Sequence, residues 1–342
     1  MSSTTHMRRE VLEIPSAVDA LLTGGQSAMT AAAAALAERD PAFMISVARG
    51  SSDHAATYFK YASELIAGVP VASVGPSVAS IYGRRLKLAG SACIAVSQSG
   101  KSPDIVSMAD MAGQEGALTF ALTNHTESDL ARVSEHTLDL HAGEELSVAA
   151  TKTFVTSIVS AVWLLAEWQK DAALLAAIHA LPEVLAKAAQ TDWGALGEKL
   201  ASAQSIYCLG RGPSFAISNE AALKFKETCQ LHAESYSSAE VLHGPVSIVG
   251  AGFPVIALTA ADQAEDSLLG VTEQIAAKGA SVFVTSDRAT TATRLPTART
   301  AHPLTDPISL IVSFYAMVEQ AARARGINPD EPRHLKKVTE TV

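Results

Sequence analysis

Short apolar runs alternate along the chain with longer segments in which apolar and polar residues recur at helical spacing. The runs of the first half are FMISVARG, VPVASVG, ACIAVSQSG, ALTFALTN and HTLDLHAG, and those of the second half are SIYCLGRG, PVIALTA and ASVFVTSD. Alternation of this kind predicts βαβ units and therefore parallel sheets. We expect an α/β fold in which each sheet is flanked by helices.

The two halves of the chain also resemble each other at a nearly constant separation. The matched pairs, in the same order, are RGSS from Arg49 with RGPS from Arg211, IAV from Ile94 with IAL from Ile256, and GALTFALTN from Gly116 with GASVFVTSD from Gly279. The first two pairs have the same separation, and that of the third is longer by a single position. We infer a duplicated α/β domain, with a helical connection around residues 165–198.

One strand-to-helix turn differs between the two copies. The first copy carries Ser97-Gln98-Ser99-Gly100, where the second carries Thr259-Ala260-Ala261-Asp262. Ligands of doubly wound domains bind at the carboxyl ends of the strands, and a turn that opens a helix offers N–H groups to a phosphate. A turn needed only for folding, with Ser99 or Ser102 as the helix cap and Pro103 in the first helical position, is the alternative. The contrast between the copies favours one phosphate site per chain.

Length and composition narrow the class of protein. A chain of 342 residues suits two domains of medium size. The formal net charge is −9 and there is no basic stripe, so we expect no nucleic-acid partner. Cys93 and Cys208 lie in apolar runs, where buried free thiols are common. Together with Cys229 they are scattered and form no disulfide framework, which fits a reducing cytosol.

We also expect no membrane segment and no metal. The segment MSSTTHMRRE lacks an apolar signal core, and the longest apolar stretch, residues 155–168, is broken by polar residues. That stretch predicts a buried helix, and the protein is expected to be soluble and cytoplasmic. The sequence has no residues at metal-ligand spacing and no cofactor motif, so we expect neither a metal nor a cofactor.

Candidate chemistry is concentrated in the second half. Glu220, Lys224 and Glu227 are spaced to share one helical face, and on its own this spacing more often indicates a solvated ladder of ion pairs. His243 stands in a rigid His-Gly-Pro turn, where a lone imidazole is more often structural. Lys337 lies in the C-terminal tail, where lysines are usually exposed.

Six motifs in order resemble the SIS (sugar isomerase) double-domain family. They are RGSS (49–52), SQSGKSPD (97–104), ELSVAATKTF (145–154), EAALKFKE (220–227), HAESYSSAEVLHGP (232–245) and PRHLKKVT (332–339). The chain is similar to the isomerase half of glucosamine-6-phosphate synthase and to stand-alone glucosamine-6-phosphate deaminases. The resemblance implies two tandem SIS domains of doubly wound, flavodoxin-like topology. The expected division is a helical segment 1–40, SIS domain 1 at 41–165, SIS domain 2 at 195–330 and a tail 331–342 that closes the active site.

The resemblance also implies roles for particular residues. Those that would bind phosphate or sugar are Gly50, Ser51, Ser52, Ser97, Gln98, Ser99, Ser102 and, through their backbone, Val148 and Ala149. Glu227 would move a proton between sugar C1 and C2, with Lys224 and Glu220 as supporting neighbours. His243 would open the sugar ring in the partner's site of a homodimer, and Lys337 would close over the ligand, as the lysine that forms a Schiff base in the synthase does. Alanine at position 150 departs from the usual serine.

The expected activity is conversion of glucosamine-6-phosphate and water to fructose-6-phosphate and ammonia. The first SIS domain is expected to start near residue 41, which leaves no room for the synthase's glutaminase domain, and the tail is closer to that of the deaminases. The alternatives are a galactosamine-6-phosphate deaminase, a deglycase of amine-linked sugar phosphates, an isomerase without amine chemistry or a synthase-like isomerase subunit. A sugar-phosphate sensor is the non-enzyme alternative, and it would have little use for Glu227, His243 and Lys337 together.

Overall fold

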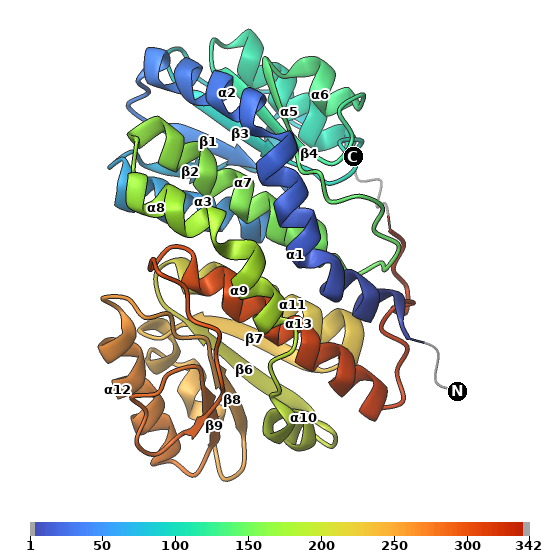
Figure 1. The fold of residues 1–342 in the computed structure, drawn as a ribbon, viewed down its shortest axis with the longest axis vertical. Coiled ribbons are helices and arrows are strands. Elements are labelled where there is room, and N and C mark those ends of the chain that lie inside the picture. The colour runs from blue at the N-terminus through green and yellow to red at the C-terminus, as the bar shows by residue number, and fades with distance from the viewer. Residues whose placement is uncertain (1–3, 338–342) are drawn as a thin grey trace. The chain divides into compact units, whose positions relative to one another are not determined.

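The computed structural model describes residues 4–337 and contains two five-stranded sheets whose paired strands all run parallel (Figure 1). The described chain forms two compact units. The first unit comprises residues 16–145, 152–179 and 336–337, and the second comprises residues 4–15, 146–151 and 180–335. The last five residues of the expected tail lie outside the described residues. Helix α1 (His6–Gly24) contributes to both units, and the division falls after its internal Pro15.

The first unit holds the sheet of the N-terminal half. Its strands are β1 (Met44–Val47), β2 (Val71–Ser73), β3 (Ala92–Val96), β4 (Leu118–Thr123) and β5 (His136–Asp139). Their order in the sheet is β2-β1-β3-β4-β5, which is the flavodoxin-like order. β1 and β3 are neighbours with Met44 opposite Ala92, and every residue of both strands is buried. Burial on both faces explains why these strands appear in the sequence as continuous apolar runs.

Helices cover both faces of this sheet. They are α2 (Gln26–Arg39), α3 (Ser51–Ile66), α4 (Ser77–Ser80), α5 (Pro103–Gln114), α6 (Asp129–Val133), α7 (Lys152–Gln169) and α8 (Ala172–His179). α7, which packs against α2 and α3, confirms that residues 155–168 form a buried helix. On the other face, α5 packs on alternate strand residues such as Ile45 and Cys93. The first unit is therefore a doubly wound layer structure.

The second unit repeats this topology. Its strands are β6 (Ser205–Gly210), β7 (His232–Ser237), β8 (Pro254–Ala257), β9 (Ser281–Val284) and β10 (Thr293–Arg294), in the order β10-β9-β8-β6-β7. In the first sheet β1 pairs with β3, and in the second sheet β6 pairs with β8. In each half, therefore, the first strand lies beside the third. Its helices are α9 (Leu181–Ala188), α10 (Gly194–Leu200), α11 (Pro213–Cys229), α12 (Glu265–Ala276) and α13 (Asp306–Ala324), with 3₁₀ turns η1 (Glu240–Leu242) and η2 (Pro245–Ile248).

The duplication inferred from the sequence is visible in matching local geometry. α5 and α12 have the same length, and their first residues, Pro103 and Glu265, have the separation that relates Arg49 to Arg211. Gly50 and Gly212 share this separation and precede α3 and α11 with φ of 55° and 57°. This backbone region favours glycine, so both copies keep it there. The expected α/β fold with two parallel sheets is confirmed.

Two strands of the second sheet were absent from the sequence prediction. β7 has the sequence HAESYS, whose polar residues conceal a strand at the edge of the sheet next to β6. β10 is only two residues long and exposed. Both lack the apolar run by which the other strands were recognised.

Cys93 and Cys208 are free and buried, as expected, and so is Cys229. Burial raises the pKa of the Cys93 thiol to about 12, so this sulfur stays protonated. Between residues 4 and 337, no helix has the length and apolar character needed to cross a membrane. The same residues contain no cluster of three or more His, Cys, Asp or Glu side chains that could hold a metal ion.

Candidate active site

A pocket of about 370 Å³ opens in the first unit where strands β1 and β3 end. Strand order changes direction between these two neighbours, which makes this the topological switch point where ligands bind in such folds. The lining residues are Arg49, Gly50, Ser52, Val96, Ser97, Gln98, Ser99, Ser102, Ile105 and Lys337. Of the predicted phosphate and sugar ligands, the pocket brings together Gly50, Ser52, Ser97, Gln98, Ser99 and Ser102, and adds Lys337. Ser51 begins α3 and is not among the lining residues.

The serine turn that lines this pocket, residues 97–102, has a fixed shape. Ser97 Oγ accepts a hydrogen bond from the Gly100 N–H at 3.2 Å, and Ser99 Oγ accepts one from the Lys101 N–H at 3.3 Å. Gly100 has φ of 60°, and a Cβ there would lie 2.1 Å from Ser128 Oγ. Ser102 takes the N-cap position of α5 and Pro103 the first helical position, but the Ser102 hydroxyl makes no capping hydrogen bond. That hydroxyl remains available to a ligand.

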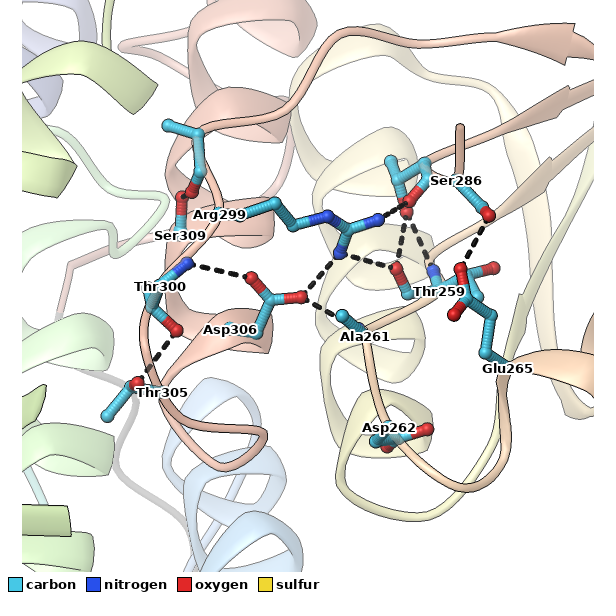
Figure 2. A network of polar contacts seen from close by, with 12 residues as sticks. Thr259, Ala261, Asp262, Glu265, Ser286, Arg299, Thr300, Thr305, Asp306 and Ser309 are labelled. Carbon is cyan, nitrogen blue, oxygen red and sulfur yellow. Dashed lines mark hydrogen bonds and ion pairs between the residues drawn. The ribbon is translucent and has the colours of Figure 1, made fainter. Parts of the chain in front are cut away.

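The matching turn of the second unit is already filled by the chain's own carboxylate (Figure 2). Asp306, which is 1% exposed, accepts hydrogen bonds from the N–H groups of Ala261 at 2.9 Å and Thr300 at 3.1 Å. Arg299 pairs with Asp306 and donates to the Thr259 carbonyl oxygen at 3.1 Å. Ala261 corresponds to Ser99 at the separation that relates the two copies. The second copy thus holds an internal anion at the backbone position where the first copy has its serine turn.

A larger chamber of about 720 Å³ adjoins the pocket lined by the serine turn, because Gln98, Ser99 and Lys337 line both. Its further lining residues follow β3, β4 and β5 and are Lys101, Asn124, His125, Asp139, His141, Gly143, Glu144 and Glu145. Lys337 Nζ donates to Glu145 Oε2 at 2.8 Å, and the Glu145 carboxylate also accepts from the N–H and hydroxyl of Thr153. The C-terminal lysine is therefore held where the two cavities meet.

The second unit contains a buried triad of charged side chains on α11. Lys224 Nζ lies 2.6 Å from Glu227 Oε2 and 3.1 Å from Glu220 Oε1. The side chains of Glu220 and Lys224 are 0% and 1% exposed, whereas that of Glu227 is 18% exposed. Tyr315 donates to Glu220 Oε1 at 3.0 Å. A solvated ladder of ion pairs would leave all three side chains in water, so the geometry excludes that interpretation.

The triad keeps its lysine charged. Burial on its own would lower the pKa of Lys224, but the charges of Glu220 and Glu227 and their hydrogen bonds raise it above its ordinary value. Lys224 is therefore an ammonium at neutral pH and does not act as a nucleophile or base. Its charge positions Glu227, whose partly exposed carboxylate is the member of the triad that a ligand can reach.

The remaining predicted residues lie elsewhere in the second unit. His243 follows η1 and is exposed, in a turn fixed by Gly244 with φ of 139° and Pro245, whose carbonyl oxygen accepts from Tyr207 at 2.9 Å. Val148 and Ala149 belong to the 146–151 segment, with Ala149 buried at 1% exposure. The structure groups the serine turn with Lys337 in one unit, and Glu220, Lys224, Glu227 and His243 in the other.

Sequence reasoning passed over three residues at the first unit's pockets. Arg49 lines the pocket of the serine turn and pairs with the fully buried Asp104, and Glu145 pairs with Lys337. Arg49 and Asp104 belong to the RGSS and SQSGKSPD motifs, and Glu145 begins ELSVAATKTF. Their charge could have drawn attention to them, because each is a charged residue inside one of the six motifs.

The family model of the SIS domain matches residues 38–167 and 199–324, which cover most of both duplicated halves. The chain belongs to the SIS domain family. A crystal structure from Silicibacter pomeroyi DSS-3, described as a candidate phosphosugar isomerase, is 60% identical and covers 96% of this chain and 100% of its own, with a TM-score of 0.93. The glucosamine-6-phosphate deaminase of Thermotoga maritima shares the fold of this SIS protein at 20% identity, over 98% of this chain and 100% of its own, with a TM-score of 0.78.

Longer proteins also match this chain over most of its length. The glutamine–fructose-6-phosphate aminotransferase of Sulfolobus acidocaldarius is 33% identical over 300 residues, which are 86% of this chain and 49% of that protein. The chain spans about half the length of the curated relatives it matches.

Proposed function

We propose that this SIS protein is an amino-sugar-phosphate deaminase and isomerase that converts glucosamine-6-phosphate and water to fructose-6-phosphate and ammonia. The observation that carries the proposal is the α11 triad, in which a buried lysine fixes a partly exposed carboxylate, Glu227, at 2.6 Å. Burying a cation between two carboxylates is costly, and such arrangements occur where a charged group must be held ready for chemistry. The relatives described as a deaminase, an aminotransferase and a candidate phosphosugar isomerase support the same substrate class.

In the proposed reaction, the serine turn of the first unit holds the substrate's phosphate. The N–H groups of Gln98, Ser99 and Ser102 make no hydrogen bond to another residue between positions 4 and 337, so they are free to donate to phosphate oxygens. Hydroxyls of Ser99 and Ser102 lie beside them. N–H groups at a helix N-terminus suit an anion.

The proton transfer is assigned to Glu227. After ring opening by His243 exposes the C1 aldehyde, Glu227 takes the C2 proton while O1 is protonated, which gives an enolamine. Glu227 then returns its proton to C1 as the nitrogen gives up one proton, so the product is a C2 imine with a C1 alcohol. Water adds to C2 and ammonia leaves, which gives the C2 ketone. One carboxylate serves both proton transfers, and the sequence needs no oxidant.

The adjoining chamber favours one second candidate, a deglycase of amine-linked sugar phosphates. The chamber is about 720 Å³, larger than the phosphate pocket, and it carries both lysines and carboxylates. A polar substituent on the substrate nitrogen, such as an amino acid, would find partners of both charges there. For an N-substituted fructosamine 6-phosphate, whose nitrogen is on C1, the same carboxylate would move the proton in the opposite direction, from C1 to C2. Water would then add to the C1 imine, and the amine would leave in place of ammonia.

The test is product release by the purified protein from a panel of 6-phosphates. The panel contains glucosamine, galactosamine and an N-substituted fructosamine 6-phosphate, and both ammonia and released amine are measured. Ammonia from glucosamine-6-phosphate, lost in Glu227→Gln and kept in Lys226→Gln, is the expected result. Lys226 is the exposed neighbour of Glu227 on the same helix and serves as the matched control. Turnover of the N-substituted substrate alone would support the deglycase, and no turnover of any amino sugar would refute both.

A further inference from the structure

An arginine stands at the edge of the phosphate pocket in a fixed position. Arg49 follows strand β1, and its Nε and Nη2 donate to Asp104 Oδ2 at 3.1 and 2.8 Å. The Asp104 side chain is 0% exposed, whereas that of Arg49 is 52% exposed. Arg49 lines the same pocket as the serine turn. The guanidinium is therefore anchored on a buried carboxylate and open towards the pocket.

The anchor itself is rigid. Asp104 is the second residue of α5, and its Oδ1 accepts a hydrogen bond from the Ile105 N–H at 2.9 Å. The carboxylate thus places one oxygen on the helix N-terminus and the other on Arg49. Within residues 4–337, Arg49 Nη1 makes no hydrogen bond. The planar fork of a guanidinium allows it to bind a carboxylate with one edge and a phosphate with the other.

The second unit provides an internal comparison. Arg211 and Asp266 stand at the positions of Arg49 and Asp104, yet they do not pair with each other. Arg211 donates to Ser237 Oγ at 3.2 Å, and Asp266, 76% exposed, pairs with Arg288. The arginine–aspartate clamp is present only in the copy that keeps the serine turn.

The filled turn of the second unit indicates what the clamp is for. There the anion at the turn, Asp306, is contacted by Arg299 as well as by the Ala261 N–H (Figure 2). An anion at the equivalent turn of the first unit would meet the Ser99 N–H and needs a cation in the same way. Arg49 is the arginine that lines that pocket.

We propose that Arg49 is a further phosphate ligand, held in place by the positioning residue Asp104, and that it makes the pocket selective for phosphate esters over uncharged sugars. The inference rests on the phosphate site of the proposed function. The formal charge of the chain is −9, so a dianionic substrate needs a local cation to overcome the repulsion. The pocket is also lined by Lys337, whose ammonium donates to Glu145, whereas Arg49 Nη1 makes no hydrogen bond within residues 4–337 and can donate to the phosphate.

The test compares Arg49→Gln and Asp104→Asn with Asp266→Asn, which removes the equivalent aspartate of the second copy. The dissociation constants of inorganic phosphate and of glucosamine-6-phosphate are measured by calorimetry, next to a melting curve for each variant. Arg49→Gln should weaken both ligands about 10- to 100-fold, the range for a lost charge-assisted hydrogen bond. Asp104→Asn should weaken them in the same direction and less, and Asp266→Asn should leave them within twofold of wild type.

These measurements separate the inference from the proposed function. If Arg49→Gln and Asp104→Asn both bind phosphate as tightly as Asp266→Asn, the pair is structural and the inference is overturned, whatever their melting temperatures. If wild type releases ammonia from no amino sugar while Arg49→Gln weakens phosphate binding, the deaminase proposal fails and the role of Arg49 stands. If either Arg49→Gln or Asp104→Asn does not fold, the phosphate affinity of the other variant decides whether Arg49 is a phosphate ligand.

Discussion

Lys337 Nζ lies 2.8 Å from the buried carboxylate of Glu145, which precedes helix α7. The same carboxylate accepts two hydrogen bonds from Thr153, near the N-terminus of that helix. A negative charge is stabilised at a helix N-terminus, and the carboxylate there accepts a hydrogen bond from the lysine. The C-terminal lysine is thereby brought to the boundary between the phosphate pocket and the larger chamber.

Replacing Glu145 by Gln should release Lys337. The variant keeps the side-chain shape but loses the charge, so we expect about 1–3 kcal/mol lower stability and a turnover reduced roughly tenfold. Glu144→Gln is the matched control, because Glu144 lines the chamber with an exposed side chain. Melting curves and ammonia release check both effects. Equal turnover in the two variants would show that Glu145 does not position Lys337 for the reaction.

Replacing Ser99 by Ala should weaken phosphate binding and leave the chemistry intact. The Ser99 N–H remains, so we expect KM to rise about tenfold, the value of one lost hydrogen bond to a charged group, with kcat within threefold. Steady-state kinetics measure the split. A fall in kcat at unchanged KM would contradict a role confined to phosphate. A bound phosphate or sulfate found at Thr259–Asp262 would refute the single-site argument.

The serine turn could be singled out from the sequence as a candidate phosphate site because the chain contains its own comparison. Ser97–Gly100 and Thr259–Asp262 occupy equivalent places, and the second has two alanines and an aspartate where the first has glutamine, serine and glycine. What fills the second turn was not predictable, because Asp306 and Arg299 lie far along the chain from it and meet the turn only in the folded unit. Partners of this kind depend on tertiary packing and leave no local pattern.

Strand β7 is an element that the sequence prediction missed. Its residues HAESYS lack an apolar run, so periodicity could not indicate a strand. The repeat could have done so, because the separation that relates Arg49 to Arg211 carries Val71–Ser73 of β2 onto positions 233–235, inside β7. Likewise, the spacing of the α11 triad predicted a shared face but not its burial, which Tyr315 of α13 completes.

Removing the triad lysine should destabilise the fold. Lys224→Met takes away the cation that balances Glu220, so we expect a loss of about 3–5 kcal/mol, measured by urea unfolding. The folded-state pKa of Lys224 is raised above its ordinary 10.5, so its contribution is complete below that pH and is lost as pH rises further. The difference between wild type and variant should therefore be constant from pH 6 to 9 and shrink only above about pH 10.5. A difference that changes between pH 6 and 9 would contradict a fixed ammonium.

Mixing two inactive variants should test whether His243 serves a partner subunit. His243 is exposed in a rigid turn, and its imidazole makes no hydrogen bond within the described part of the chain. If it acts across a homodimer, hybrids of His243→Ala with Glu227→Gln contain one intact site, and about a quarter of wild-type activity should return after random exchange. Subunit exchange is verified by mass spectrometry of differently labelled chains. Persistent inactivity of verified hybrids would mean that each site uses one chain.

The Glu227→Gln variant separates a catalytic carboxylate from a structural one. Glutamine keeps the shape and can still accept from Lys224, but it cannot take a proton. A carboxylate in acid–base catalysis contributes about 10²- to 10⁴-fold in rate, or roughly 3–5 kcal/mol of barrier.

Because the Glu227 side chain is partly exposed, at 18%, and Glu220 still balances Lys224 in this variant, the fold should lose little stability. We expect kcat for ammonia release to fall at least a hundredfold, KM to stay within threefold, and the melting temperature to stay near that of Lys226→Gln. Loss of kcat together with a collapse of the melting curve would assign Glu227 to the fold. Near-normal turnover in a well-folded variant would remove the proton transfer from Glu227, whereas only a wild-type protein without turnover would favour the sugar-phosphate sensor.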